Sequence, residues 1–352
     1  MEVKQKDWYS HIIDKGVFDR MKRKFLLIGF ITLFMLVLAA CGGEKESEQD
    51  PSLDKDESRE TAQTKQELTE ENGTRTIEYL GESYTVPEKV ERIVVTGAME
   101  AMEDMVVLDV HPVGAIAVGG KFPELYASVT DKAESIGEKI KPNFEKIVEL
   151  APDVILGSTK FPEEVRGKLE KIAPTILVSH ISTDWENNLN LLAELTGKQA
   201  DAEKILSTYK ADIEAAKATL IEKLKGQKVA AIRMRGGQAY VYPKEVFFNP
   251  VLYGELGLEV PNEVSKAKSQ EAISVEQLAD MNPDYVFIQF SADENADAPN
   301  ALEDFKKNPI VQNITAFKND QVFVNVVDPL MEGGPAYSRI KFLESVQQYL
   351  LK

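Results

Sequence analysis

Short apolar runs alternate with segments of helical spacing along most of the chain. The runs that predict buried strands are RIVVTG from Arg92, VGAIAV from Val113, DVIL from Asp153, TILV from Thr175, KVAAIR from Lys228, DYVFI from Asp284 and QVFVNV from Gln321. After the first run, AMEAMEDMVVLD from Ala98 has a helical pattern and predicts the helix behind that strand. Alternation of strands and helices is typical of an α/β fold with mainly parallel sheets.

Two further patterns lie near the ends of this alternation. In residues 76–87, TIEYLGESYTVP, alternation around Leu80-Gly81-Glu82 predicts a β-hairpin, and we expect the folded part to begin there. At the other end, residues 337–351 have an amphipathic helical pattern and close the chain.

The alternation stops between Lys198 and Lys225. This stretch has no proline and no glycine, and a stripe of apolar residues recurs at helical spacing from Ile205 to Leu224. Gly226 follows, where a helix stop is favoured. The pattern predicts one helix of about 25 residues, roughly 37 Å long.

The segments on either side of this helix repeat one another. NFEKIVELAPDVIL begins at Asn143 and SVEQLADMNPDYVFI at Ser274, each with a helix-capping residue first. Each has a glutamate two positions later, Glu145 or Glu276, and a Pro-Asp pair that leads into a strand. Helix–Pro-Asp–strand is a common connector, but two copies at matched spacing favour duplicated lobes.

The sequence therefore predicts two Rossmann-like α/β lobes with mainly parallel sheets. We expect the N-terminal lobe over residues 76–196, the joining helix within 197–226 and the C-terminal lobe over 227–352, with a ligand cleft between the lobes.

Residues 21–41 read MKRKFLLIGFITLFMLVLAAC and are typical of a secretory signal. Three basic residues follow Met21, and the apolar core over 25–37 is too short for a comfortable membrane span. The LAACGG run resembles a bacterial lipobox, which implies lipidation of Cys41 and a location on the outer face of the cell membrane. An uncleaved anchor is the alternative, and residues 1–20 precede a good start at Met21.

Residues 41–75 follow the signal, and 44–75 are charged, polar and nearly without large apolar groups. Such a segment cannot bury enough surface to offset the entropy of ordering, so we interpret it as a disordered tether. Cys41 is the single cysteine of the 352-residue chain, so no internal disulfide is possible.

The formal net charge is -17, which argues against nucleic acid as a partner, because no basic face would release counterions. In so acidic a chain, clustered cations are informative. The run VAAIRMRGG places Arg233 and Arg235 two apart, on one face of a strand. Gly236-Gly237 then allows a sharp turn and leaves room for a ligand.

Ligands of open α/β sheets bind outside the carboxyl ends of the strands. Lys160 follows the strand that starts at Asp153, Lys139 precedes the Asn143-capped helix, and Gln270 precedes the matching helix of the second half. For a lysine, an ordinary solvated cation is the alternative. For the arginines, the alternative is an acidic partner from elsewhere in the chain, since none is near in sequence.

The predicted ligand is an anion that already contains its metal. Three histidines, His11, His111 and His180, are too few to favour a protein metal site, and the last two are interpreted as structural. Iron(III) bound by three deprotonated catechols carries three net negative charges, offers only acceptors to donor-only cations, and presents ring faces to them. We therefore expect no resident cofactor and no metal ligands from the protein.

Three alternatives remain open at this stage. A ferric hydroxamate carrier is one, although such complexes carry little negative charge. A siderophore-processing esterase is another, but no G-x-S-x-G occurs, and Ser179-His180 is an adjacent pair without a supporting motif. The third is a purely adhesive surface lipoprotein.

Together these features resemble the helical-backbone, or class III, substrate-binding lipoproteins of bacterial ABC importers. YTVPEKVERIVV from Tyr84 and the two Glu/Pro-Asp segments are similar to recurring marks of that family. Six further runs resemble its branch for ferric bacillibactin and enterobactin-type complexes: GEK from Gly137, STKFP from Ser158, IRMR from Ile232, VFFNPVLYGELGL from Val246, KAKSQE from Lys266 and FSADENAD from Phe290.

The resemblance implies a monomeric, non-enzymatic protein that presents a ferric catecholate to an ABC permease. It implies a basic triad at Lys139, Lys160 and Arg235, with supporting contacts from Arg233 and Gln270. One departure is Gly236, where a glutamine is expected. The resemblance also implies that Glu145 and Glu276, one per lobe, dock onto permease arginines. Helix-start acids favoured by the macrodipole are the plainer interpretation of both.

Overall fold

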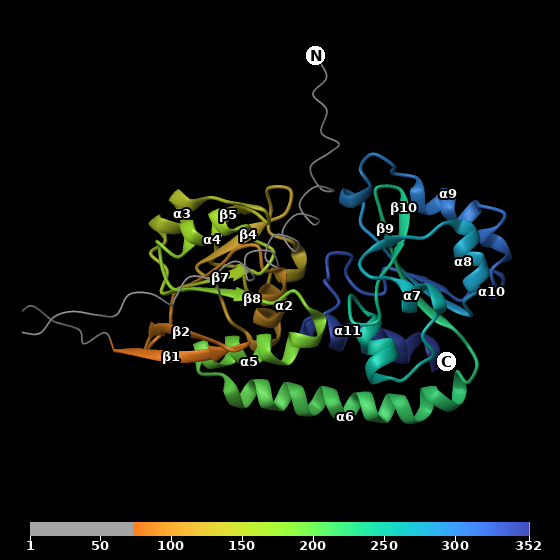
Figure 1. The fold of residues 1–352 in the computed structure, drawn as a ribbon, viewed down its shortest axis with the longest axis horizontal. Coiled ribbons are helices and arrows are strands. Elements are labelled where there is room, and N and C mark those ends of the chain that lie inside the picture. The colour runs from red at the N-terminus through yellow and green to blue at the C-terminus, as the bar shows by residue number, and fades with distance from the viewer. Residues whose placement is uncertain (1–72, 352) are drawn as a thin grey trace, which may run out of the picture. The chain divides into compact units, whose positions relative to one another are not determined.

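The structure is a computed structural model that describes residues 73–351 (Figure 1). The predicted signal segment, Cys41 and the tether up to residue 72 lie outside the described residues. The first element is a hairpin of β1, Thr74–Tyr79, and β2, Glu82–Pro87, which pair antiparallel. Leu80 and Gly81 both have positive φ, 50° and 84°, as a two-residue hairpin turn of type I′ requires. The predicted hairpin is confirmed, with its first strand starting two residues early.

A six-stranded sheet follows in the order β6-β5-β4-β3-β7-β8. Its strands are β3 Ile93–Val95, β4 Gly114–Ala117, β5 Glu134–Glu138, β6 Lys141–Pro142, β7 Val154–Ser158 and β8 Thr175–Val178. All neighbours are parallel except β5 and β6, which form a short antiparallel hairpin. Its helices are α2 Met99–Leu108, η1 Glu124–Tyr126, α3 Phe144–Glu149, α4 Glu163–Leu169, η2 Ser182–Asp184 and α5 Trp185–Thr196. We call this sheet with its helices the N-terminal lobe.

A five-stranded sheet forms the C-terminal lobe, in the order β11-β10-β9-β12-β13. Its strands are β9 Val229–Arg235, β10 Gln238–Val241, β11 Glu271–Ala272, β12 Tyr285–Phe290 and β13 Val322–Val324. The predicted parallel strands of this half are present, and two antiparallel strands extend the sheet at one edge. β9, β12 and β13 are parallel, but Gly236-Gly237 returns the chain as β10, which pairs antiparallel with β9 and β11.

Short helical segments surround the second sheet. They are η3 Pro250–Glu255, α7 Asn262–Lys266, α8 Val275–Met281, η4 Asp293–Asn295, α9 Ala301–Lys307, η5 Val311–Asn313 and α10 Thr315–Lys318. The last element is α11, Ala336–Leu350, where the final amphipathic helix was predicted.

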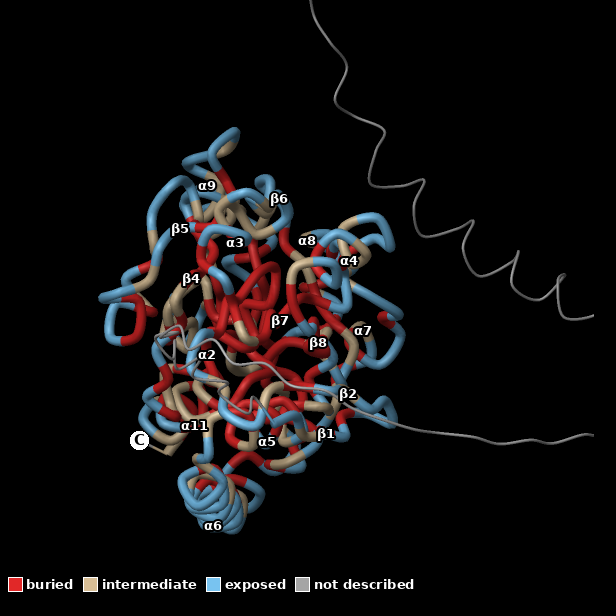
Figure 2. Tube along the Cα trace, turned by 90° about the vertical axis from the view of Figure 1, so that its left-hand side faces the viewer, coloured by how far each residue is buried: buried red, intermediate tan, exposed pale blue. Residues whose placement is uncertain are grey.

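The predicted long helix is α6, Gln199–Lys223, with 25 residues. Its buried face consists of Ala202, Tyr209, Ile213, Ala216 and Leu220, and the rest of its surface is mostly exposed (Figure 2). Gly226 follows with φ 73°, a left-handed conformation that favours glycine. α6 packs against α5 of the N-terminal lobe and against α11, whose own partners include α2.

The repeated Pro-Asp segments have the same structural role in both lobes. Asn143 caps α3 by accepting the backbone N–H of Lys146, and Ser274 forms a capping box with Gln277 at α8. The aspartates then tie each following strand to a central strand. Asp153 accepts the N–H groups of Glu91 and Arg92 ahead of β3, and Asp284 accepts that of Lys228 ahead of β9.

The docking candidates Glu145 and Glu276 lie in the first turns of α3 and α8, and both are exposed. The described residues belong to one compact unit, Thr69–Lys352. Among these described residues, no helix has the length and apolar character needed to cross a membrane.

Candidate functional site

Arg233 and Arg235, at the end of β9, converge on one carboxylate. Arg233 donates to both oxygens of Glu294, from Nε at 2.9 Å and from Nη2 at 2.8 Å. Arg235 donates to Oε1 of the same carboxylate from Nε at 3.1 Å and from Nη2 at 2.5 Å. The prediction that the two guanidinium groups share one face is therefore confirmed. Glu294 is the acidic partner that could not be identified near them in the sequence.

Sheet topology brings Glu294 to the arginines from about sixty residues away. β12 lies beside β9 in parallel register, with Gln289 opposite Arg233, so η4 emerges next to the end of β9. The Gly236-Gly237 turn is bonded to that segment. Gly236 donates its N–H to the Glu294 carbonyl at 2.9 Å, and Gly237 donates to Asn295 Oδ1 at 3.0 Å. The turn and η4 together fix the arginine pair.

Gln270 completes the group in the C-terminal lobe. Its Oε1 accepts a hydrogen bond from Arg235 Nη1 at 3.0 Å and another from the hydroxyl of Tyr242 at 3.1 Å. Burial raises the pKa of Tyr242 despite the opposing charges of the two arginines, so its phenol stays protonated. Arg235 is thus oriented by an amide on one side and by Glu294 on the other, while 40% of its side chain remains exposed.

Lys139 lies in the turn between β5 and β6 of the N-terminal lobe. Its ammonium is 2.5 Å from Oε1 of Glu332, in the loop between β13 and α11. Burial alone lowers the pKa of Lys139, but the nearby Glu332 and Glu100 carboxylates raise it overall, so the ammonium stays charged. Gly137 permits the tight hairpin, since a Cβ at its φ of 101° would lie 2.5 Å from the Lys141 carbonyl oxygen.

Lys160 lies two residues beyond β7, at the carboxyl end of its strand as predicted. Its ammonium is 3.4 Å from Oε1 of Glu100, at the start of α2. The Lys160 side chain is 45% exposed, whereas that of Glu100 is only 6% exposed. Burial raises the pKa of Glu100, and Lys160 and Lys139 only partly offset that effect.

Two further buried acids of α2 anchor the segment that carries Glu332. Glu103 accepts the backbone N–H of Glu332 at 2.7 Å and that of Ser338 at 3.0 Å. Asp104 accepts the N–H of Ala336 at the start of α11. Burial raises the pKa of Glu103 to about 8, against the lowering effect of the hydrogen bonds from the Glu332 backbone and the Ser338 side chain. The helical pattern of AMEAMEDMVVLD predicted this helix but gave no signal for its buried acids.

The predicted cations of both lobes act on a single group, Glu332. Burial by itself raises the pKa of Glu332, but Lys139, Lys160 and Arg233 lower it overall, so the carboxylate is ionised. Burial lowers the pKa of Arg235, but the contact with Glu294 raises it overall. The charge of Glu332 adds a smaller effect in the same direction. The structure thus brings Lys139, Lys160, Arg233, Arg235 and Gln270 to one place, where the sequence had predicted a ligand site.

The comparison with known proteins agrees with this geometry. A family model described as periplasmic binding protein matches residues 94–325. The chain belongs to this family. The resemblance read from its motifs is confirmed at the family level.

Several relatives of this periplasmic binding protein carry iron-related names. It is 47% identical to the iron-uptake system-binding protein of Bacillus subtilis (strain 168) over 328 residues, which cover 93% of this chain and 99% of that protein. It is also 30% identical to the iron(3+)-hydroxamate-binding protein FhuD of the same organism over 318 residues, covering 86% and 93% of the two chains.

This periplasmic binding protein also resembles solved structures of iron-related binding proteins. The triscatecholate siderophore binding protein FeuA from Bacillus subtilis, complexed with ferri-bacillibactin, matches with a TM-score of 0.75 and 51% identity, covering 79% of this chain and 98% of that one. The fold of this periplasmic binding protein is therefore the helix-joined, two-lobed α/β fold predicted from the sequence.

The residues considered earlier as metal ligands or as a catalytic pair form other contacts in this periplasmic binding protein. His111 is exposed between Asp109 and Asp131. Ser179 donates its hydroxyl to Asp184, while Nδ1 of His180 lies 2.8 Å from Thr159 Oγ1. Within residues 73–351, no group of three or more His, Cys, Asp or Glu side chains could hold a metal ion.

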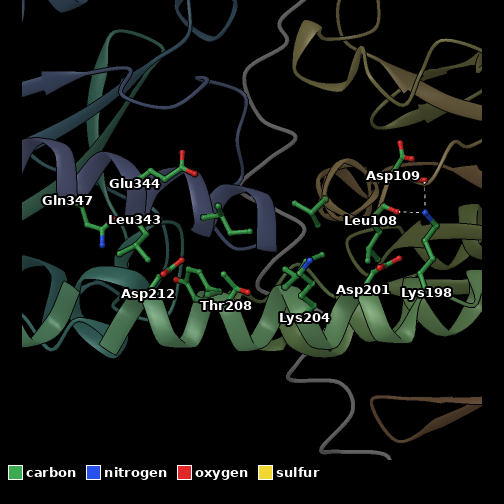
Figure 3. A pocket seen from close by; sticks show the side chains of 14 residues that line it. Leu108, Asp109, Lys198, Asp201, Lys204, Thr208, Asp212, Leu343, Glu344 and Gln347 are labelled. Atoms are coloured by element: carbon green, nitrogen blue, oxygen red, sulfur yellow. Dashed lines mark hydrogen bonds between the residues drawn. The ribbon is translucent and has the colours of Figure 1, made fainter. Parts of the chain in front are cut away.

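A groove of about 520 Å³ lies along α6, where that helix faces the end of α2 and α11 (Figure 3). Lys198 closes one end by donating to the carbonyl oxygens of Leu108 and Asp109 (Figure 3). The groove contains none of the five predicted ligand-binding residues, so it is separate from the candidate site.

Proposed function

We propose that this protein captures a ferric tris-catecholate siderophore, of bacillibactin or enterobactin type, outside the cell and delivers it to an ABC permease for iron uptake. The observation that carries the proposal is the convergence of four cations from both lobes on Glu332. Apart from Glu100, whose pKa is raised by burial, the carboxyl groups that pair with these cations, Glu294 and Glu332, are too few to neutralise all four. The site is therefore suited to an anion of high charge.

The proposed roles follow from exposure. Lys139, Lys160 and Arg235 form the triad that contacts the catecholate oxygens, because their side chains are 34%, 45% and 40% exposed. Arg233 is nearly covered and supports Arg235 through Glu294, and Gln270 orients Arg235 from the other side. The iron arrives inside the ligand, so the protein supplies no metal ligand, holds no cofactor and performs no reaction.

The relative FeuA supports the catecholate proposal, because its solved complex contains ferri-bacillibactin. The hydroxamate-binding relative makes a ferric hydroxamate the second candidate. Such complexes carry little net charge and would leave the four cations poorly neutralised. The cation cluster therefore favours the catecholate.

The remaining parts of the proposal concern anchoring and delivery. Cys41 would carry the lipid that holds the mature, monomeric protein on the outer face of the cell membrane. Glu145 and Glu276, exposed on α3 and α8, would dock onto permease arginines. We infer only a small closure around the ligand, since α6 is one unbroken helix of 25 residues.

Uptake of radioactive iron tests this function. Cells that lack the protein should not accumulate iron supplied as a tris-catecholate complex, and expression of the intact chain should restore uptake. Restored uptake from a hydroxamate complex alone would instead favour the second candidate. Equal uptake in cells with and without the protein would reject the proposal.

A further inference from the structure

The backbone of Glu332 is held in place, whereas its side chain accepts a single hydrogen bond among the described residues. Its N–H is bonded to Glu103, and Gly333 follows with φ 82° against the backbone of Phe247, where a Cβ would approach to 2.7 Å. Among the described residues, the one hydrogen bond that reaches the Glu332 carboxylate comes from Lys139. The loop therefore presents this carboxylate at a defined position, where its side chain can still reorient.

Glu294 is held very differently. It receives four hydrogen bonds from two guanidinium groups, two from each arginine. An ammonium on a flexible stem exchanges its partner more easily than two planar guanidinium forks do. Of these two acidic side chains, Glu332 is therefore the one that a ligand can replace.

We propose that Glu332 is an internal counter-anion: it occupies the ammonium of Lys139 in the empty site, and oxygens of the bound ferric complex take its place there. This inference rests on the proposed function. It identifies Glu332 as a specificity-determining residue, since an anion has to compete with a carboxylate already in place.

Counting charges shows the consequence. Apart from Glu100, whose pKa is raised by burial, the charges of Lys139, Lys160, Arg233 and Arg235 are opposed by the Glu294 and Glu332 carboxylates, which form ion pairs with three of these cations. The empty site thus has two excess positive charges, and a trianion leaves one excess negative charge. Without the Glu332 charge, the same trianion would be neutralised completely.

Glu332 should therefore prevent the four cations from repelling one another in the empty protein, while it weakens the binding of every anion. Ordinary small anions gain too little from the site to displace it. A compact trianion gains enough, and binds with an affinity below the greatest that the cations could supply. This balance would favour both selectivity and later release to a permease.

The test uses the intact chain, a hexadentate tris-catecholate complex of iron(III) and a Glu332→Gln variant. Glutamine has nearly the same volume, and the backbone anchor to Glu103 is unchanged. We expect the variant to bind the complex about tenfold more tightly at low salt, because one negative charge near a trianion has been removed. The gain should shrink as salt is raised, since screening weakens it.

Matched controls separate this effect from others. Asp293→Asn removes an exposed charge next to Glu294 and should change affinity by less than about twofold. Glu332→Ala should tighten binding as Glu332→Gln does, which covers misplacement of the glutamine amide. Circular dichroism checks that each variant is folded.

Each outcome decides the inference. Tighter binding by both Glu332 variants, with a salt-sensitive gain, supports it. Unchanged or weaker binding by the folded variants, or a gain that salt does not reduce, overturns it. Absence of binding by the wild-type protein would instead contradict the proposed function itself.

Discussion

Arg233 donates two hydrogen bonds to the carboxylate of Glu294, at 2.9 and 2.8 Å, and only 8% of the arginine side chain is exposed. Arg235 shares Oε1 of the same carboxylate but is 40% exposed. The two arginines, two residues apart on β9, therefore have different roles. Arg233 fixes the carboxylate, and Arg235 presents its charge to a ligand.

This division predicts different defects for the two arginines. Arg235→Ala should weaken ferric-catecholate binding by about tenfold or more while the protein stays folded, because a charge-assisted contact is lost. Lys160→Ala should behave in the same way. Arg233→Ala should also lower the free energy of unfolding, by about 2 kcal/mol, because Glu294 loses two of its four hydrogen bonds and keeps those from Arg235. Fluorescence titration and denaturant unfolding measure the two effects. Wild-type affinity in Arg235→Ala would remove that residue from the site.

The glycine turn after β9 predicts a matched pair of stability changes. Gly236 and Gly237 have φ of 55° and 77°, so alanine at either position should cost about 1 kcal/mol of strain. The two positions differ in the room that they leave for an added Cβ atom. A Cβ at Gly236 meets nothing within 4 Å, whereas one at Gly237 would lie 2.9 Å from Cβ of Ala298. Gly237→Ala should therefore be the less stable variant in urea unfolding, and equal midpoints would contradict the described turn.

The two described histidines should titrate on opposite sides of pH 6.5. The hydrogen bond to Asp131 raises the pKa of His111, although its slight burial opposes this. Burial, and then the charge of Lys160, lower the pKa of His180. The stability that His111 contributes is thus present below pH 6.5 and is lost as pH rises through its raised pKa. NMR titration of the two imidazoles measures both values.

His180 should also report on the ligand. A trianion bound at Lys160 would favour the protonated imidazole nearby and raise the pKa of His180, while His111 stays unchanged. The diamagnetic gallium(III) complex of the same catecholate allows the NMR measurement. An unmoved His180 in the presence of bound complex would place the ligand away from Lys160.

The docking proposal predicts a loss of uptake without a loss of binding. Glu145→Arg and Glu276→Arg reverse exposed charges in the first turns of α3 and α8. Each variant, and the double variant that combines them, should bind the ferric complex normally but deliver little iron to cells, because like charges would face the permease. Glu222→Arg, an exposed change on α6, is the control and should transport normally. Normal uptake by the double variant would contradict this role.

Periodicity predicted the first hairpin, the strands β3, β4, β7, β8, β9, β12 and β13, the long helix and the final helix, because these patterns are local, but it did not predict β5, β6, β10 and β11. The shared face of Arg233 and Arg235 was predictable for the same reason. Glu294 was harder to find, since it reaches the arginines only because β12 lies beside β9. The sharp turn predicted at Gly236-Gly237 is confirmed, but the sequence analysis did not extend it to a hairpin in which β10 pairs with β9.

Glu332 had no local signal at all. Its position depends on a loop fixed by Glu103 of α2, more than two hundred residues earlier in the chain. The acids of α2 were missed because burying carboxylates is costly, so a sequence pattern assigns them to the surface. Their cost is met here by backbone N–H groups of the Glu332 loop and α11.

The most direct test of the central claim is one titration series on the wild-type protein, with intrinsic fluorescence as the readout. A tris-catecholate complex of iron(III) and a neutral tris-hydroxamate complex are compared at low and high salt. We predict clearly tighter binding of the catecholate, with an affinity that falls as salt is raised, because four cations neutralise its charge. Equal or tighter binding of the hydroxamate, or catecholate binding that does not respond to salt, would contradict the account.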